Sequence, residues 1–196
     1  MNIKQNPFKI NFMKKLILIC STISFMACNY TIDKIDKETC STSVEEGKRL
    51  VSALGCNDCH STKKMTEFGP IPDEKLLLSG HPQNMSLSEY DPSLPNSGTW
   101  ILFNGSGTAA VGPWGTSFAS NLTPHETGLG NWTLKQFTKA MKEGKSKGLE
   151  NGRLLLPPMP WMGYKSLNDK DLTAIFNYLQ SLEPVENLVP APLPPL

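Results

Sequence analysis

Cys56-Asn57-Asp58-Cys59-His60 is the stretch of this chain that most constrains its fold. Two cysteines separated by two residues, with a histidine directly after the second, form the pattern for covalent attachment of a c-type haem. Each thiol can add to one vinyl group of the haem, and the histidine can bind the iron as its proximal ligand. The pattern therefore predicts one covalent haem c, with Cys56 and Cys59 as attachment sites and His60 as proximal ligand.

Two other kinds of site also use a C-x-x-C pair. A structural zinc site needs four ligands, and the chain beyond Cys28 offers only Cys40, His81 and His125 in addition, none of them in a second C-x-x-C knuckle. A thioredoxin-like redox pair is expected within a βαβ unit, whereas the residues that flank this motif have the pattern of a helix. Both alternatives fit the sequence less well than haem.

Composition indicates one small domain with long irregular segments. The chain has 196 residues, of which 39% are hydrophobic, together with sixteen prolines and fifteen glycines, which favour turns and loops. Residues 1–27 contain four lysines and no acidic residue, so the remainder carries fifteen basic and eighteen acidic side chains. This weakly acidic body gives no indication of a nucleic-acid partner.

The amino terminus has the features of an export signal. Met13-Lys14-Lys15 precedes an apolar run from Leu16 to Ala27, which is too short to span a bilayer as a helix. Residues 1–27 are therefore predicted to be a signal peptide, with Met13 as an alternative start. The end of the run, Phe25-Met26-Ala27-Cys28, resembles a bacterial lipoprotein cleavage box. That resemblance implies lipidation of Cys28 and a membrane anchor outside the cytoplasm, and an ordinary cleaved signal is the alternative.

Residues 28–42 are predicted to be a solvated tether between the lipidated Cys28 and the body of the chain. Cys40 lies within this polar segment. If Cys56 and Cys59 hold haem, Cys40 is either a free thiol or the partner of Cys28 or of another chain.

Three helices are predicted in the body of the chain, which spans residues 43–183. The first begins at Thr42 or Ser43 and ends near Gly55, and Gly47 in its middle suggests close packing against another helix. The other two each begin with a polar cap and carry apolar residues at helical spacing. They are expected from Thr133 to Gly144, with Met141 in the core, and from Asn168 to Leu182. Residues 184–196 are predicted to be an extended, proline-rich tail.

Loops are expected to dominate residues 61–121. The apolar run Thr99–Phe103 followed by Asn104-Gly105 predicts a small β-hairpin there. His81 lies in a Gly-His-Pro turn, where an isolated histidine is expected to be exposed to solvent. A large flat cofactor could serve as the core for so long a stretch without helices.

The distal side of the iron is expected to be occupied by methionine. Methionine opposite histidine raises the potential of a haem iron, and Met159 lies on a stiff segment between Pro158 and Pro160. Met162 is the less favoured alternative because Gly163 follows it. His125 is a further candidate, but its surroundings indicate a polar surface turn.

The order of the motifs resembles the class I cytochromes c, in particular the cytochrome subunits of bacterial alcohol and aldehyde dehydrogenases. The similarity covers about residues 43–190 and rests on segments that follow one another in this order: Cys56–His60, Gly112–Gly115, Asn121–Pro124, Thr127–Thr133, Pro157–Trp161 and Asp169–Leu179. The resemblance implies that Met159 is the distal ligand. Pro70, which follows Gly69, becomes the candidate for the carbonyl that orients the proximal histidine.

The predicted fold is therefore an all-α class I cytochrome c fold, with three to four helices around one haem and long intervening loops. The resemblance implies single-electron transfer outside the cytoplasm to and from redox partner proteins such as a dehydrogenase, an oxidase or another cytochrome. Four tryptophans are candidates for the haem walls: Trp100, Trp114, Trp132 and Trp161. The alternative function is a peroxidase-like haem enzyme, which would need an open distal position on the iron.

Overall fold

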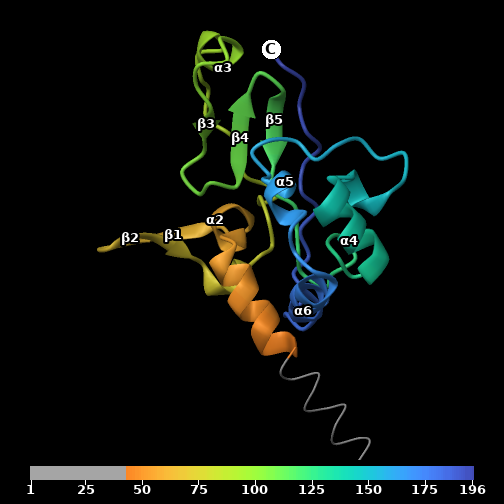
Figure 1. Cartoon of the computed structure of the whole chain (residues 1–196). Helices are drawn as coiled ribbons and strands as arrows, with labels where there is room; N and C mark the ends of the chain where they lie inside the picture. The colour runs from red at the N-terminus through yellow and green to blue at the C-terminus, as the bar shows by residue number, and fades with distance from the viewer. Residues whose placement is uncertain (1–42) are drawn as a thin grey trace, which may run out of the picture. The chain divides into compact units, whose positions relative to one another are not determined.

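The computed structural model describes residues 43–196, which form one compact unit (Figure 1). Residues 43–53 are helical. The elements that follow are α2 (Cys56–His60), β1 (Lys63–Thr66), β2 (Gly69–Pro72), the short 3-10 helix η1 (Glu74–Leu76), α3 (Ser93–Asn96), β3 (Leu102–Phe103), β4 (Ala109–Gly112), β5 (Gly115–Phe118), α4 (Leu134–Glu143), the 3-10 turn η2 (Ser146–Gly148), α5 (Trp161–Tyr164) and α6 (Asp169–Gln180).

The two long carboxyl-terminal helices begin at the caps that the sequence predicts. Thr133 caps α4 and forms a capping box with Gln136, and the left-handed Gly144 ends the helix. Asn168 caps α6 and forms a second capping box with Asp171. On each helix the predicted apolar stripe is buried at its centre, including Phe137 and the core methionine Met141 of α4.

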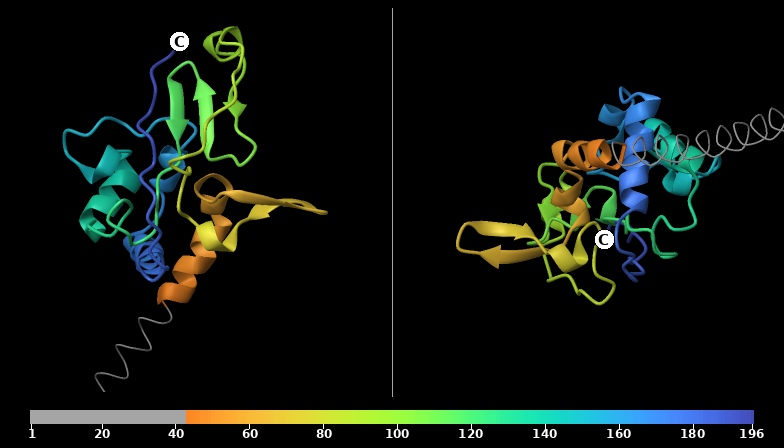
Figure 2. Two further views of the ribbon diagram at one scale, coloured as in Figure 1. Left: turned by 180° about the vertical axis from the view of Figure 1, so that it is seen from behind. Right: turned by 90° about the horizontal axis from the view of Figure 1, so that it is seen from below.

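The core lies where the helix of residues 43–53 meets α6 and α4. Views from behind and below show the amino-terminal helix crossing α6 (Figure 2). Its buried residue Val51 belongs to the same hydrophobic cluster as Leu172, Ile175 and Leu179 of α6. On the surface, Lys142 of α4 forms an ion pair with Asp169 of α6, with 2.7 Å between Nζ and Oδ1.

Two small antiparallel sheets accompany the helices, so the prediction of an all-α fold is confirmed only in part. β1 and β2 form a hairpin that projects from the body (Figure 1), and β3, β4 and β5 form a three-stranded sheet in that order. The predicted hairpin near Asn104 is present between β3 and β4, but its loop runs from Asn104 to Thr108. Asn104 contributes through its side chain, which accepts a hydrogen bond from the backbone N–H of Ala109 at 3.0 Å.

The carboxyl-terminal tail is extended and contacts the body at several points. It runs beside β5 (Figure 1), where Leu193 and Thr116 exchange two backbone hydrogen bonds. Near the start of the tail, the side chain of Asn187 is buried. The predicted signal peptide, the predicted lipidation site Cys28 and the predicted tether with Cys40 lie outside the described residues.

Candidate haem site

The C-x-x-C-H motif forms one short helix directly after the amino-terminal helix. Gly55, in the left-handed conformation with φ of 69°, turns the chain from residues 43–53 into α2. Cys56 and Cys59 are three residues apart on α2 and therefore share one face of the helix. Both are half-buried free thiols, and His60 is buried with 9% of its surface exposed.

The thiols are not activated as those of a redox pair would be. Burial raises the pKa of Cys56 to about 11 and also raises the pKa of Cys59. Cysteines that act as redox nucleophiles have lowered pKa values instead. Among residues 43–196, no group of three or more His, Cys, Asp and Glu side chains is placed to hold a metal ion.

The imidazole of His60 is oriented by the backbone of a distant loop. Its Nδ1 lies 2.8 Å from the carbonyl oxygen of Ser120. A carbonyl can only accept, so Nδ1 carries the proton and Nε2 presents a lone pair. Nε2 has no hydrogen-bond partner within the described part of the chain, which leaves it available to bind iron.

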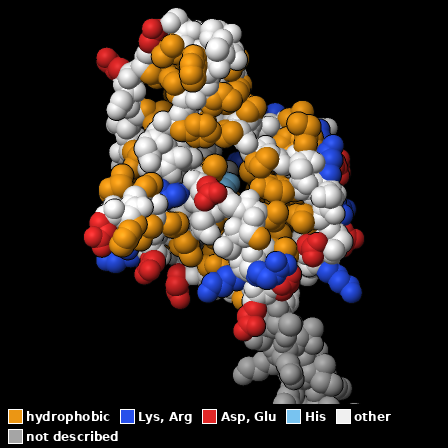
Figure 3. Space-filling view, turned by 60° about the vertical axis from the view of Figure 1, so that its left-hand side comes forward, with side chains coloured by type: hydrophobic (Ala, Val, Ile, Leu, Met, Phe, Trp, Pro, Cys, Tyr) orange, Lys and Arg blue, Asp and Glu red, His pale blue; other side chains and the backbone are white. Residues whose placement is uncertain are grey.

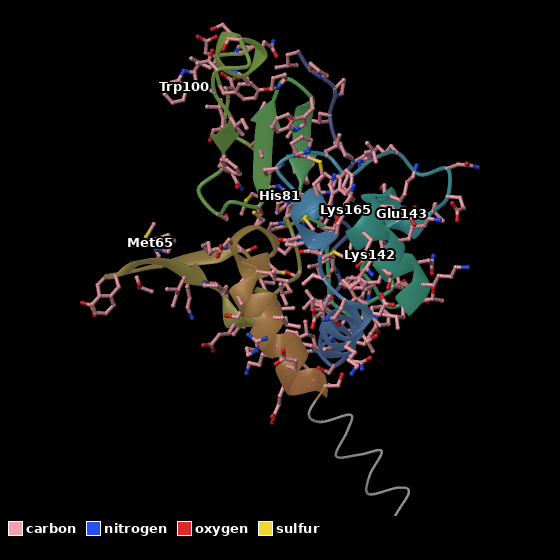
Figure 4. The ribbon with its side chains drawn as sticks, in the orientation of Figure 1. Met65, His81, Trp100, Lys142, Glu143 and Lys165 are labelled. Carbon is pink, nitrogen blue, oxygen red and sulfur yellow. The ribbon has the colours of Figure 1, made fainter. Side chains whose placement is uncertain are left out.

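The acceptor is Ser120, and the prediction of Pro70 is wrong. Pro70 lies in β2, where it pairs with Met65 of β1 in the projecting hairpin. Figure 4 shows Met65 on this hairpin, away from the body. Because Gly69 and Pro70 build the turn end of that hairpin, their carbonyls are carried away from the imidazole.

Lys63 holds the end of α2 in place. Its ammonium group donates to the backbone carbonyls of Asn57 at 2.8 Å, Asp58 at 3.0 Å and Ser61 at 2.6 Å. It also lies 3.3 Å from the carbonyl of Ser106 in the β3–β4 loop. A lysine just after the end of a helix is a known partner for the last carbonyls, so this contact could have been inferred from sequence.

Met159 lies on a segment that is tied to the body on both sides. Before it, the hydroxyl of Ser117 in β5 donates to the carbonyl of Pro157 at 2.6 Å. After it, the hydroxyl of Tyr164 in α5 lies 3.3 Å from the carbonyl of Leu54, two residues before Cys56. The second contact brings the methionine segment and the cysteine helix together. No sequence pattern indicated Ser117, whereas an aromatic residue soon after Met159 was a weak signal for Tyr164.

The two candidate methionines differ in burial. Met159 is partly buried and packs against the hydrophobic core, as does Cys56. Met162 has 70% of its surface exposed. Of the candidate wall residues, Trp132 packs against the core, whereas Trp100 is 61% exposed, and Figure 4 shows Trp100 beside α3, far from α2.

The two remaining histidines have partners of their own. His81 is fully buried, which corrects the expectation of an exposed turn residue. Its Nδ1 lies 2.9 Å from the hydroxyl of Thr108, its Nε2 lies 3.3 Å from the carbonyl of Met85, and its ring packs on Phe118. His125 lies in the predicted polar turn, where the backbone N–H of Thr127 donates to its Nδ1 at 3.2 Å.

One face of the molecule is rich in apolar side chains. Figure 3 shows a narrow hollow with hydrophobic groups around its rim and a histidine at its floor. A separate cavity of about 650 Å³ lies between the β1–β2 hairpin, residues 85–90 and the β3–β4 hairpin. Its walls include Lys63 and Pro70 but none of the predicted attachment or ligand residues.

The donor set fits a covalently attached haem. Two thiols on one helical face, a buried imidazole with a free Nε2 and a half-buried thioether are the groups that such a cofactor requires. Comparison with known proteins gives the same result, because residues 44–183 match the family described as cytochrome c. The chain belongs to the cytochrome c family. Family membership implies a covalently bound haem c and an electron carrier rather than a catalytic enzyme.

This cytochrome is similar to subunits of several bacterial dehydrogenases. It is 36% identical over 123 residues to the fructose dehydrogenase cytochrome subunit of Gluconobacter japonicus, which covers 59% of this chain and 25% of that protein. It is 40% identical over 89 residues to a subunit of the nicotinate dehydrogenase of Pseudomonas putida, or 45% of this chain and 7% of that protein.

A third relative covers more of the cytochrome. The gluconate 2-dehydrogenase cytochrome c subunit of Pantoea cypripedii is 28% identical over 164 residues, which is 83% of this chain and 27% of the relative. The cytochrome therefore spans about a quarter or less of the length of these three relatives. Within residues 43–196, no helix has both the length and the apolar composition needed to cross a membrane.

Proposed function

We propose that this cytochrome carries single electrons outside the cytoplasm through one haem c, attached to Cys56 and Cys59 and ligated by His60 and Met159. The observation that carries the proposal is the hydrogen bond from Nδ1 of His60 to the Ser120 carbonyl. It fixes the tautomer of His60 in which Nδ1 carries the proton and Nε2 carries the lone pair. When bound, the haem supplies an iron that exchanges one electron between its ferric and ferrous states.

Burial supports Met159 over Met162 as the distal ligand. A ligand on the haem must be withdrawn from solvent in both oxidation states, and Met159 packs against the same core as Cys56, whereas Met162 faces solvent. Ser117 and Tyr164 tie the backbone on either side of Met159 to β5 and to the amino-terminal helix. These ties restrain the thioether, so that the ligand set changes little when an electron is exchanged.

The redox partner is proposed to be a dehydrogenase. Three similar proteins are named as subunits of fructose, nicotinate and gluconate dehydrogenases. Because the cytochrome spans only part of each relative, the substrate of such a partner does not follow from the similarity. The single C-x-x-C-H motif in the sequence supports one haem per chain.

The cytochrome is further proposed to be exported and held at a membrane by lipid on Cys28. The support is the apolar run that ends in Phe25-Met26-Ala27-Cys28. Durable anchoring needs more than one acyl chain, which a lipoprotein anchor would supply.

Optical spectra of the Met159→Ala and Met162→Ala variants test the function and the distal ligand together. Ferric iron bound to thioether sulfur has a weak long-wavelength charge-transfer band. The Met159 variant should lose this band, show a lower potential and bind cyanide, because the soft ligand that favours ferrous iron is gone. The Met162 variant should resemble the wild type.

Each alternative has its own outcome in this experiment. Loss of the band in the Met162 variant alone would reassign the ligand and leave electron transfer intact. A wild-type protein without the band that binds cyanide or peroxide rapidly would contradict the electron-carrier proposal and support the peroxidase-like alternative. Haem that is removed by denaturing electrophoresis would contradict attachment to Cys56 and Cys59.

A further inference from the structure

His60 is held by two hydrogen bonds that come from two different segments of the chain. The Ser120 carbonyl accepts a hydrogen bond from Nδ1 of His60 at 2.8 Å. The backbone N–H of Gly80 donates to the backbone carbonyl of His60, also at 2.8 Å. The position of the imidazole therefore depends on how residues 78–83 and residues 119–127 are held relative to each other.

These two segments lie side by side around His60. The N–H of His81 donates to the carbonyl of Ala119 at 2.9 Å, and the N–H of Leu122 donates to the carbonyl of Leu78 at 2.8 Å. Gly80, with φ of 82°, allows the close approach, because a Cβ there would lie 2.6 Å from the carbonyl carbon of Ser120.

The buried side chain of Asn187, in the carboxyl-terminal tail, binds the first segment. Its Nδ2 donates to the carbonyls of Ser79 at 2.7 Å and His81 at 2.9 Å, and its Oδ1 accepts from the N–H of Gln83 at 2.9 Å. Both N–H groups and the oxygen of the amide are thus used. Only 7% of Asn187 is exposed, so water cannot readily replace these bonds.

The backbone around Asn187 binds the second segment. The N–H of Asn187 donates to the hydroxyl of Thr127 at 3.1 Å. The side chain of Asn121 donates to the carbonyl of Val185 at 2.8 Å and lies 3.4 Å from that of Asn187. Asn187 therefore joins the two segments that hold His60. Its side chain binds the segment that contains Gly80, and its backbone binds the segment that contains Ser120.

We propose that Asn187 is a positioning residue for the proximal ligand His60. By maintaining the His60–Ser120 hydrogen bond, Asn187 influences the reduction potential of the iron. This inference rests on the proposed function, because it takes His60 as an iron ligand. A firm bond from Nδ1 to a carbonyl makes the imidazole more basic, and a more basic ligand favours ferric iron. Without the Asn187 side chain the two segments are held less firmly against each other, the hydrogen bond weakens, and the ferrous state gains relative stability.

Redox titration of the Asn187→Ala holoprotein tests this inference. We expect a higher midpoint potential, corresponding to a several-fold shift of the one-electron equilibrium toward ferrous iron, where a tenfold shift equals about 59 mV. The thioether–iron band should remain, because the change acts on the proximal side. Asn187→Ser, which keeps one donor, should shift the potential less and is the variant to measure if Asn187→Ala does not accumulate.

Two control variants separate positioning from a general loosening of the tail. Truncation after Pro190 keeps Asn187 but removes the backbone pairing of Leu193 with Thr116. Leu188→Ala changes the exposed neighbour of Asn187. Both controls should keep the wild-type potential, even if the truncation lowers the melting temperature.

Three results would overturn the role of Asn187 while leaving the proposed function intact. They are an unchanged potential in both Asn187 variants, an equal shift in the truncated protein, and loss of the thioether–iron band in Asn187→Ala. A wild-type holoprotein that itself lacks the band contradicts the proposed His60/Met159 ligation instead, so the two failures are distinguishable.

Discussion

Gly47 of the amino-terminal helix lies directly against the backbone of Ala174 in α6. A Cβ at position 47 would contact the carbonyl of Ala174 and would lie 2.7 Å from the Cβ of Tyr178. This is the close helix packing that the glycine predicted from sequence. Because the helix of residues 43–53 leads through Gly55 into α2, the same contact sets the position of Cys56 and Cys59, the proposed attachment sites, relative to the core.

Gly47→Ala should destabilise the cytochrome. Forcing a methyl group into this contact costs about 1–3 kcal/mol, and the upper part of that range outweighs the gain in helix propensity of about 1 kcal/mol. Thermal unfolding should show a melting temperature lower by a few degrees. Gly163→Ala in α5 is the matched control, because a Cβ there meets no atom within 4 Å. Equal melting temperatures for the two variants would contradict the packing role of Gly47.

Lys63→Met should lower the free energy of unfolding by about 1.5–3 kcal/mol, because hydrogen bonds from a charged group to several carbonyls are lost together. The carbonyls of Asn57, Asp58 and Ser61 would then need water at the end of α2. Denaturant unfolding of the holoprotein measures the change. Lys64→Met, at the exposed next position of β1, should stay within about 0.5 kcal/mol of wild type. A Lys63 variant as stable as this control would show that the contacts contribute nothing.

His81 should make the stability of the cytochrome depend on pH. Burial lowers the pKa of His81 below its ordinary value of 6.5. As the pH falls below about 6.5, the unfolded chain binds a proton that the folded protein does not. The free energy of unfolding should therefore fall with pH until the pKa of the folded state is reached, by about 1.4 kcal/mol for each unit of pKa lowering.

Denaturant unfolding of wild type and His81→Gln from pH 5 to pH 8 isolates this effect. The difference in free energy between the two proteins should be constant above pH 7 and should change in favour of the variant as the pH falls. A difference that stays constant over the whole range would show that His81 titrates alike in the folded and unfolded states.

Cys28→Ser should release the cytochrome from membranes, because lipid on Cys28 is its proposed anchor. After cell fractionation, wild type should pellet with membranes and the variant should be found in the soluble fraction outside the cytoplasm. Cys40→Ser, in the same segment, serves as the control and should pellet like wild type. Soluble wild-type protein would contradict lipid anchoring.

The sequence by itself determined the features that depend on neighbouring residues. Thr133 with Gln136 and Asn168 with Asp171 are three residues apart, so each capping box follows from local spacing and marks where α4 and α6 begin. The C-x-x-C-H motif is equally local, because its predicted attachment and ligand groups lie within one short helix. The flanking prolines and the family resemblance both predict Met159, rather than Met162, as the distal ligand.

Only the tertiary structure decided which distant groups meet around His60. Ser120 binds the imidazole through a backbone carbonyl, a group that every residue possesses, so no residue type at position 120 could reveal it. His81 is buried because Thr108 and Phe118, from distant parts of the chain, converge on it. Asn187 likewise meets residues 79–83 across more than 100 positions of sequence. Such contacts arise when separate segments pack together, and the spacing of residues along the chain carries no record of them.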